Sequence, residues 1–308
     1  DILGDSQFAL QSGGPETASL LLKARLETST GFCTDLKNAF NSANRAHVLE
    51  RLFLYPELNS LFRLAHWAYS SPTPLYIFDC KGKLIDTLLS TNGTRQGDVL
   101  ASLLFCLTIK PSIEAALAAG GPEVSAVADM DDVTFVGPQD GIAVTQAVKA
   151  YETSCALSDL TLQNHKSFFI CFHGGSLATE TIDFATPRGI RVVNDACIIL
   201  GTPMGPDKAK VQQLALERLD RYNRFFGALQ HKDMPLTVAD KLLRLCGVPA
   251  MNYLSRVGLF DEYSQGIYFF DKSVGAAAIA QVNWSKDSNF VEPLSPPVLA
   301  QLAAPLRH

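Results

Sequence analysis

The feature that most constrains this chain is a run of three carboxylates between two short apolar segments. Residues 124–128 and 133–136 have the pattern of strands, and Asp129, Asp131 and Asp132 lie in the connection between them. A tight hairpin turn normally carries Asn-Gly or Asp-Gly. Like charges placed this close raise one another's pKa values unless a cation neutralises them. The segment therefore predicts either a metal site or an exposed acidic turn, in which solvent screens the repulsion.

The remaining hydrophobic pattern mixes helices and strands first and becomes helical later. Helices are expected at residues 17–27, from about 42, at 57–69, at 98–117 with an interruption at Pro111, and at 141–157. Strands are expected at residues 31–35, 74–78, 84–90, 167–172 and 190–200. From Pro206 onward the pattern is helical almost to the end. This order predicts an α+β domain followed by a helical one.

Composition excludes several classes of protein. Of the 308 residues, 47% are apolar and 19% charged, which rules out a disordered or low-complexity chain. No uncharged run reaches the roughly 18 residues of a membrane-spanning helix, so no membrane partner is expected. The seven cysteines are scattered without a C-x-x-C pair, as in an intracellular protein with reduced thiols. The net charge of −5 gives no global signature of nucleic-acid binding.

Positive charge is concentrated late in the chain. Residues 206–256 contain nine Lys or Arg and five acids, a net charge of +4. Arg218, Arg221 and Arg224 fall on one side of the helix expected there, away from its apolar face. Such a row is either a solvated helix face or a surface for a phosphate backbone.

Two further segments carry polar residues next to apolar stretches. Asp35 ends the strand expected at residues 31–35, and a lone aspartate there is usually a turn or capping residue. Gln96 and Gly97 lead into the helix expected at residues 98–117, where backbone N–H groups can face an anionic ligand. The combination of both segments with the acidic hairpin favours a functional role for Asp35.

In this order and at this spacing, the segments resemble the palm motifs of reverse transcriptases, especially those of non-LTR, LINE-like retroelements. The matching segments are Gln7-Phe8 with Gly13-Gly14-Pro15-Glu16, Asp35 with Asn38-Ala39-Phe40-Asn41-Ser42 and Arg45, Arg95-Gln96-Gly97-Asp98, Met130-Asp131-Asp132-Val133, Leu162-Gln163-Asn164-His165-Lys166-Ser167, and Leu200-Gly201-Thr202-Pro203-Met204-Gly205. A single motif of this kind is weak, whereas several in order are specific. The chain is therefore similar to an RNA-directed DNA polymerase domain.

The resemblance implies a particular α+β architecture. A right-hand polymerase palm, with an antiparallel sheet and helices on one face, would be followed by a helical thumb-like region. The implied division is a fingers-to-palm segment at residues 1–34, a palm with a primer-grip hairpin at 35–205, and a helical thumb or connection at 206–308. Only Lys23 and Arg25 precede Asp35 as cations, so we expect the fingers, which hold the triphosphate through basic residues in this family, to be largely missing.

The resemblance also implies the reaction, which is template-directed addition of deoxynucleotides to a primer 3′ end with two Mg²⁺ ions, or Mn²⁺. The implied metal ligands are Asp35, Leu36 through its carbonyl, Asp131 and Asp132. Lys166 would protonate the leaving pyrophosphate. Phe40 would exclude the ribose 2′ hydroxyl, and Gln96 and Gly97 would position the template and the nucleotide.

Nucleic-acid contacts are implied for a second set of residues. These are Arg95, Gly201, Pro203, Gly205, Arg218, Arg221 and Arg224. The implied partners are an RNA template, a DNA primer and deoxynucleoside triphosphates, and the implied location is intracellular, in the nucleus.

Two alternatives stay open. The first is a catalytically inactive reverse-transcriptase-like domain that only binds nucleic acid. It is favoured by the missing fingers and by Asp129, because the family has Tyr or Phe at that position, whereas intact carboxylates at Asp35, Asp131 and Asp132 favour the enzyme. The second is a group II intron maturase-like protein, and the Asn41-Ser42 pair favours the LINE-like branch over it.

Overall fold

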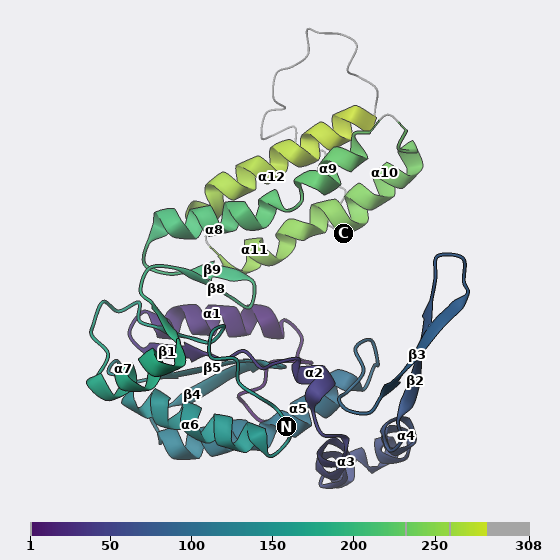
Figure 1. Ribbon diagram of the computed structural model, residues 1–308. Coiled ribbons are helices and arrows are strands. Elements are labelled where there is room, and N and C mark those ends of the chain that lie inside the picture. Colours follow the sequence, from purple (N-terminus) through teal and green to yellow (C-terminus); the bar gives the residue numbers. More distant parts are fainter. Residues whose placement is uncertain (1, 232, 259, 282–308) are drawn as a thin grey trace. The chain divides into compact units, whose positions relative to one another are not determined.

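The chain forms two compact units (Figure 1). The computed structural model describes residues 2–231, 233–258 and 260–281. The first unit is Asp1–Asp195 and the second is Ala196–His308. Each unit has its own hydrophobic core.

The first unit is built on a five-stranded sheet. Its strands are β1 (Thr30–Cys33), β4 (Ser125–Asp129), β5 (Asp132–Gly137), β6 (Phe168–Ile170) and β7 (Arg191–Val193). Their order is β4-β5-β1-β6-β7, and every neighbouring pair is antiparallel except the parallel pair of β6 and β7. The expected sheet-and-helix fold of mixed α and β structure is confirmed.

Helices cover both faces of this sheet, whereas the resemblance implied helices on one face only. The unit contains α1 (Gly14–Leu26), α2 (Ala39–Ser42), α3 (Arg45–Phe53), α4 (Asn59–Tyr69), α5 (Ala101–Gly120), α6 (Ile142–Ala156) and α7 (Thr179–Ala185). The buried side chain of Phe32 belongs to the core shared with α5 and α6, and Phe135 packs edge-on against Tyr151 of α6 at 5.2 Å. A Cβ at Gly31 would come within 2.5 Å of Leu26, so α1 lies on the face opposite to Phe32.

The long central helix runs through Pro111 without a break, contrary to the interruption expected there. A proline inside a helix removes one hydrogen bond and crowds the preceding turn. The turns on both sides of Pro111 are buried in the core, with Leu107 and Ile109 before it and Ile113 and Ala116 after it. Apolar burial on both sides therefore offsets the lost hydrogen bond and keeps the helix continuous.

Helix α5 is also the one helix of the described residues that is long and apolar enough to cross a membrane. The sequence analysis expected no such segment, because Lys110 and Glu114 interrupt the apolar run. Half of the helix's most apolar stretch is buried within the protein, which a core helix also shows. Length and composition alone therefore do not distinguish a core helix from a spanning one here.

The hairpin expected at residues 74–78 and 84–90 is present and strongly exposed. Strands β2 (Thr73–Phe78) and β3 (Leu84–Ser90) form a separate two-stranded sheet that extends away from α3 and α4 (Figure 1). The carboxylate of Asp79 accepts hydrogen bonds from the backbone N–H groups of Lys81 and Lys83, which closes the turn. Large apolar side chains on this hairpin are exposed, and they are Leu75, Tyr76, Ile77, Phe78, Leu84, Ile85, Leu88 and Leu89.

The second unit combines a small hairpin with helices. It contains β8 (Cys197–Ile199), β9 (Thr202–Met204), α8 (Lys208–Asp220), α9 (Asn223–Leu229), α10 (Leu236–Leu242), α11 (Asn252–Val257) and α12 (Phe260–Gln281). The single helix expected across residues 206–229 ends at Asp220 and restarts at Asn223. After this break both Tyr222 and Phe226 pack edge-on against Phe270 of α12, at 6.4 and 5.4 Å.

The hairpin β8–β9 belongs to the same compact unit as these helices, whereas the implied division placed it with the palm at residues 35–205. The hydroxyl of Tyr263 donates to the Pro203 carbonyl at 2.9 Å, and that of Tyr253 donates to the Leu200 carbonyl at 2.6 Å. These contacts attach the hairpin to α11 and α12. Residues 282–308 of the expected helical region lie outside the described residues.

Candidate active site

The sheet brings distant carboxylates to one end. Strands β1 and β5 are antiparallel neighbours with Cys33 opposite Thr134, and the Thr34 N–H donates to the Val133 carbonyl at 2.9 Å. Asp35 therefore leaves β1 at the sheet end where the β4–β5 hairpin turns. The turn residues Met130 and Asp131 join Asp129 to Asp132, which are paired across the hairpin.

The Asp35 carboxylate is oriented by the segment that follows residue 160. The Gln163 side-chain amide donates to Oδ1 of Asp35 at 2.6 Å, and the Lys166 ammonium lies 3.9 Å from the same oxygen. The Asp35 N–H donates to the Ser167 hydroxyl at 3.1 Å. The Asp35 side chain remains 38% exposed. The segment thus fixes one carboxylate oxygen while the group stays open to a ligand.

The turn that carries Asp131 is held by a buried glutamine. Met130 has a φ of +57°, a backbone conformation that non-glycine residues rarely adopt. The Gln7 side chain, 2% exposed, accepts from the Met130 N–H at 2.9 Å and donates to the Met130 carbonyl at 3.3 Å. This two-point contact satisfies both main-chain groups of the turn residue and fixes the position of Asp131.

Burial and mutual repulsion raise the pKa values of all three hairpin carboxyls. Burial is the first cause for Asp131 and for Asp129, followed by the charge of Asp35 on Asp131 and that of Asp131 on Asp129. Partial desolvation, followed by the charges of Asp131, Asp129 and Asp35, raises the pKa of Asp132 to about 6. The crowding expected from the sequence is confirmed, and burial is the largest single cause of each shift.

We expect the raised pKa of Asp132 to make the free energy of unfolding of the metal-free protein depend on pH. The folded state keeps a proton on Asp132 up to about pH 6, whereas an unfolded chain loses it near 3.8. The unfolded state therefore binds fewer protons between these values, and the free energy of unfolding falls as the pH rises from about 4 to about 6. Relative to the wild type, Asp132→Asn should become more stable over this interval. Urea unfolding in EDTA at several pH values measures the difference, and a difference independent of pH would contradict the expectation.

The donor set fits a magnesium ion that is shared with a substrate. Among the described residues, no group of three or more His, Cys, Asp or Glu side chains is arranged to hold a metal. Mg²⁺ commonly uses only one or two protein carboxylates and completes its shell with water and substrate phosphates. Asp35 and Asp131, which repel each other, would supply such a pair, and a cation between them would relieve the repulsion.

Leu36, whose carbonyl the resemblance implies as a further metal ligand, follows Asp35 in an isolated bridge. Leu36 forms an isolated bridge with Leu162, in which the hydrogen bonds are made by the flanking groups, the Asp35 carbonyl and the Lys37 N–H. The bridge therefore leaves the main-chain groups of Leu36 itself directed away from Leu162.

Phe40, which the resemblance implies as the residue that excludes the ribose 2′ hydroxyl, packs against other aromatic and apolar side chains. Its ring stacks on Phe105 of α5, with ring centres 4.5 Å apart and planes 17° apart. Phe40 is partly buried and packs against the main core. It is thus held as a core residue would be.

The turn that carries Gln96 and Gly97 is exposed at its apex and anchored at its base. Both residues are exposed, and Gly97 has a φ of +89° with no atom within 4 Å of the place where a Cβ would stand. Arg95, predicted to contact nucleic acid, is instead turned inward: its guanidinium donates to the Ala68 carbonyl and to the Thr73 hydroxyl. Arg95 therefore supports the turn from within the protein.

The residues implied in nucleic-acid contact in the second unit do not form one surface row. The turn of β8–β9 has positive φ at both Leu200 and Gly201, as a two-residue turn of type I′ requires. The Arg218 guanidinium lies against Gly201, and it also lies 5.7 Å from the ring centre of Tyr253. Pro203 is buried and Gly205 half-buried, while Arg221 and Arg224 are exposed. The predicted row of three arginines is therefore reduced to two exposed cations, because Arg218 packs against Gly201 and Tyr253.

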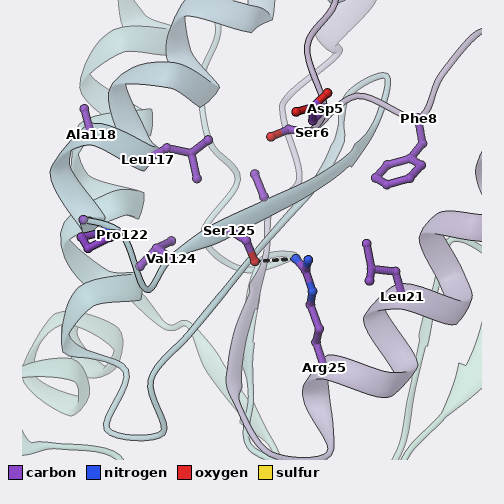
Figure 2. Close-up of a pocket in the computed structure, with 12 residues that line it drawn as sticks. Asp5, Ser6, Phe8, Leu21, Arg25, Leu117, Ala118, Pro122, Val124 and Ser125 are labelled. Atoms are coloured by element: carbon purple, nitrogen blue, oxygen red, sulfur yellow. Dashed lines mark hydrogen bonds between the residues drawn. The ribbon is translucent and has the colours of Figure 1, made fainter.

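A separate hollow lies beside β4, the outermost strand at one side of the sheet (Figure 2). Its volume is about 520 Å³, and residues of α1, α5 and β4 line it. Figure 2 shows Arg25 of α1 donating to the Ser125 hydroxyl of β4, at 2.6 Å. None of the residues predicted to act on nucleotides lines this hollow.

Sequence reasoning missed three residues that support the site. Gln7, Gln163 and Ser167 lie in matching motifs but had been given no role. Their local signal is a polar residue placed within an apolar stretch, and only the folded chain shows which main-chain or carboxylate group each one meets.

A comparison with known proteins finds sequence similarity over part of the chain. No family model matches it. The retrotransposable element SLACS 132 kDa protein of Trypanosoma brucei gambiense is 32% identical over 106 residues. That match covers 34% of this chain and 9% of the relative.

Solved structures of telomerase are similar only at a low level. Apo telomerase from Candida tropicalis has a TM-score of 0.47 and 11% identity, covering 92% of this chain and 51% of the other. Telomerase from Candida albicans in complex with a TWJ fragment of telomeric RNA has a TM-score of 0.45 and 11% identity, covering 91% and 50%. At these values the likeness adds nothing to the assignment.

The ordered motifs, which are similar to those of reverse transcriptases, thus lie on a sheet with a carboxylate hairpin.

Proposed function

We propose that this domain extends a primer 3′ end with deoxynucleotides under the direction of an RNA template, as the polymerase palm of a LINE-like retroelement. The observation that carries the proposal is the convergence of Asp35 with Asp131 and Asp132 from segments nearly a hundred residues apart. Isolated acidic turns do not need a second carboxylate from a neighbouring strand, whereas two-metal phosphoryl transfer does.

Several polar groups at this end of the sheet have a place in the proposed reaction. Asp35 and Asp131, with the Leu36 carbonyl, would bind Mg²⁺, and Asp132 would support them. When bound, the two ions would stabilise the attacking and leaving oxygens of an in-line displacement. Gln163 holds the orientation of Asp35.

Proton transfer and nucleotide positioning are assigned to residues beside the carboxylates. Lys166, whose side chain is 55% exposed, could donate a proton to the leaving pyrophosphate because it lies next to Asp35. Gln96 and Gly97 present an open backbone turn toward which a nucleotide could approach closely. We assign Phe40 the exclusion of the ribose 2′ hydroxyl, and we place the reaction in the nucleus by the same family resemblance.

Primer extension tests this function. Poly(rA) annealed to oligo(dT) is incubated with dTTP and Mg²⁺, and we expect elongated products that disappear in EDTA. Absence of extension, together with retained binding of the same duplex, would instead support the inactive nucleic-acid-binding domain, which the acidic Asp129 favours.

We further propose that the exposed arginines of the second unit contact the phosphates of the template–primer duplex. Replacing both Arg221 and Arg224 by Gln should weaken duplex binding equally for every sequence. Loss of two phosphate contacts should flatten the slope of log K against log salt by about 2. As a control, Arg244→Gln removes an arginine that is already paired with Asp240 at 2.8 Å. An unchanged slope in the double variant would contradict this assignment.

A further inference from the structure

One aromatic residue links both sides of the exposed turn at residues 95–98. Tyr69 ends α4 and is 1% exposed. Its hydroxyl donates to Oδ2 of Asp98 at 2.6 Å and accepts from the Arg95 N–H at 3.2 Å. The other oxygen of Asp98 accepts from the Leu100 N–H at 2.9 Å, just before α5 begins. A single hydroxyl thus connects the first and last residues of the turn to each other.

Two arginines lie over the ring of the same tyrosine. The guanidinium carbons of Arg45 and Arg95 are 5.4 and 4.9 Å from the ring centre, within the range of cation–π contacts. Arg45 is 6% exposed and donates to the carbonyls of Gly93 at 3.0 Å and Ser90 at 2.7 Å. Arg45 therefore attaches the backbone before the turn to Tyr69.

The apex of the turn contrasts with this anchored base. Gln96 and Gly97 are exposed, and open space surrounds the position of a Cβ at Gly97. A turn that is held at both ends and accessible to solvent at its centre can bind a ligand with a smaller loss of conformational entropy. Such a base is costly to build, because it buries two guanidinium groups and a phenol that all require partners.

We infer that Tyr69 is a positioning residue for nucleotide binding, and that its hydroxyl holds the turn at residues 95–98 in the geometry that receives the incoming nucleotide. The inference rests on the proposed function, because it assigns Gln96 and Gly97 to the nucleotide. It adds that the turn is preorganised by Tyr69 together with Arg45 and Arg95, of which the sequence analysis gave a role only to Arg95.

The variant Tyr69→Phe distinguishes the contribution of the hydroxyl from that of the ring. The variant keeps the aromatic surface under both arginines and removes only the two hydrogen bonds of the hydroxyl. We expect the KM for dTTP in primer extension to rise about tenfold with kcat within about twofold, since about 1.4 kcal/mol of positioning is lost. Tyr76→Phe, on the exposed β2–β3 hairpin, is the matched control and should leave both constants unchanged.

Hydrogen exchange provides a readout that does not depend on activity. The Arg95 amide should exchange about tenfold faster in Tyr69→Phe, because it loses its acceptor, while core amides of α5 stay protected. If the wild type extends primers but Tyr69→Phe changes neither KM nor the exchange at residues 95–98, the inference is wrong and the proposed function stands. If the wild type fails to extend primers, the proposed function is wrong, and the inferred role in nucleotide binding fails with it even where exchange shows the turn to be held.

Discussion

Asp35→Asn and Asp131→Asn are each expected to reduce primer extension at least about 1000-fold. Each change keeps the size of the side chain but removes a negatively charged metal ligand. The lost transition-state stabilisation is then about 4 kcal/mol. Since Asp35 raises the pKa of Asp131, each substitution also removes repulsion, and we expect thermal stability to be equal to or above that of the wild type.

The control for these variants is an exposed carboxylate elsewhere in the same unit. Asp183→Asn, on α7, changes the net charge by the same amount and should leave extension unchanged. Extension within tenfold of the wild type by either Asp35→Asn or Asp131→Asn would show that these carboxylates do not carry the reaction.

Gln7→Leu is expected to affect both stability and activity. The substitution leaves the main-chain N–H and carbonyl of Met130, which are partly buried, without their side-chain partners. We expect the free energy of unfolding to fall by about 2 to 4 kcal/mol. Because the turn that positions Asp131 loses its support, kcat should fall about tenfold to a hundredfold under conditions where the variant is folded.

Gln139→Leu is the matched control for that variant. Gln139 is exposed, and its side chain also donates to a main-chain carbonyl, that of Thr28, at 3.0 Å. Its replacement should change the stability by less than about 1 kcal/mol. A Gln7→Leu protein with wild-type urea midpoint and wild-type kcat would show that the Met130 turn needs no such support.

Local patterns predicted most elements because the signals are themselves local. The β2–β3 hairpin was expected from two apolar runs around Lys81 and Gly82, and it is present. Errors occurred where packing opposed a local rule. Core burial carries α5 through Pro111, and the helix expected to continue past Asp220 breaks where Tyr222 and Phe226 turn toward α12.

For the candidate site, too, some features were predictable from the sequence and others were not. Motif order placed Asp35, Asp131 and Lys166 in one site, and in the structure the Lys166 ammonium lies 3.9 Å from the Asp35 carboxylate. Side-chain direction was not predictable: the guanidinium of Arg95 turns into the protein, and that of Arg218 packs against Gly201. Which long side chain reaches which distant backbone group depends on the tertiary fold and leaves no periodic trace in the sequence.

The choice of nucleotide by the template tests the central claim most directly. The protein is given oligo(dT) on poly(rA) or oligo(dG) on poly(rC), each with dTTP or dGTP and Mg²⁺. The proposed function predicts that dTTP is added only on poly(rA) and dGTP only on poly(rC), and that Asp131→Asn abolishes both additions. Addition of either nucleotide without regard to the template, or equal addition by Asp131→Asn, would contradict a template-directed polymerase built on these carboxylates.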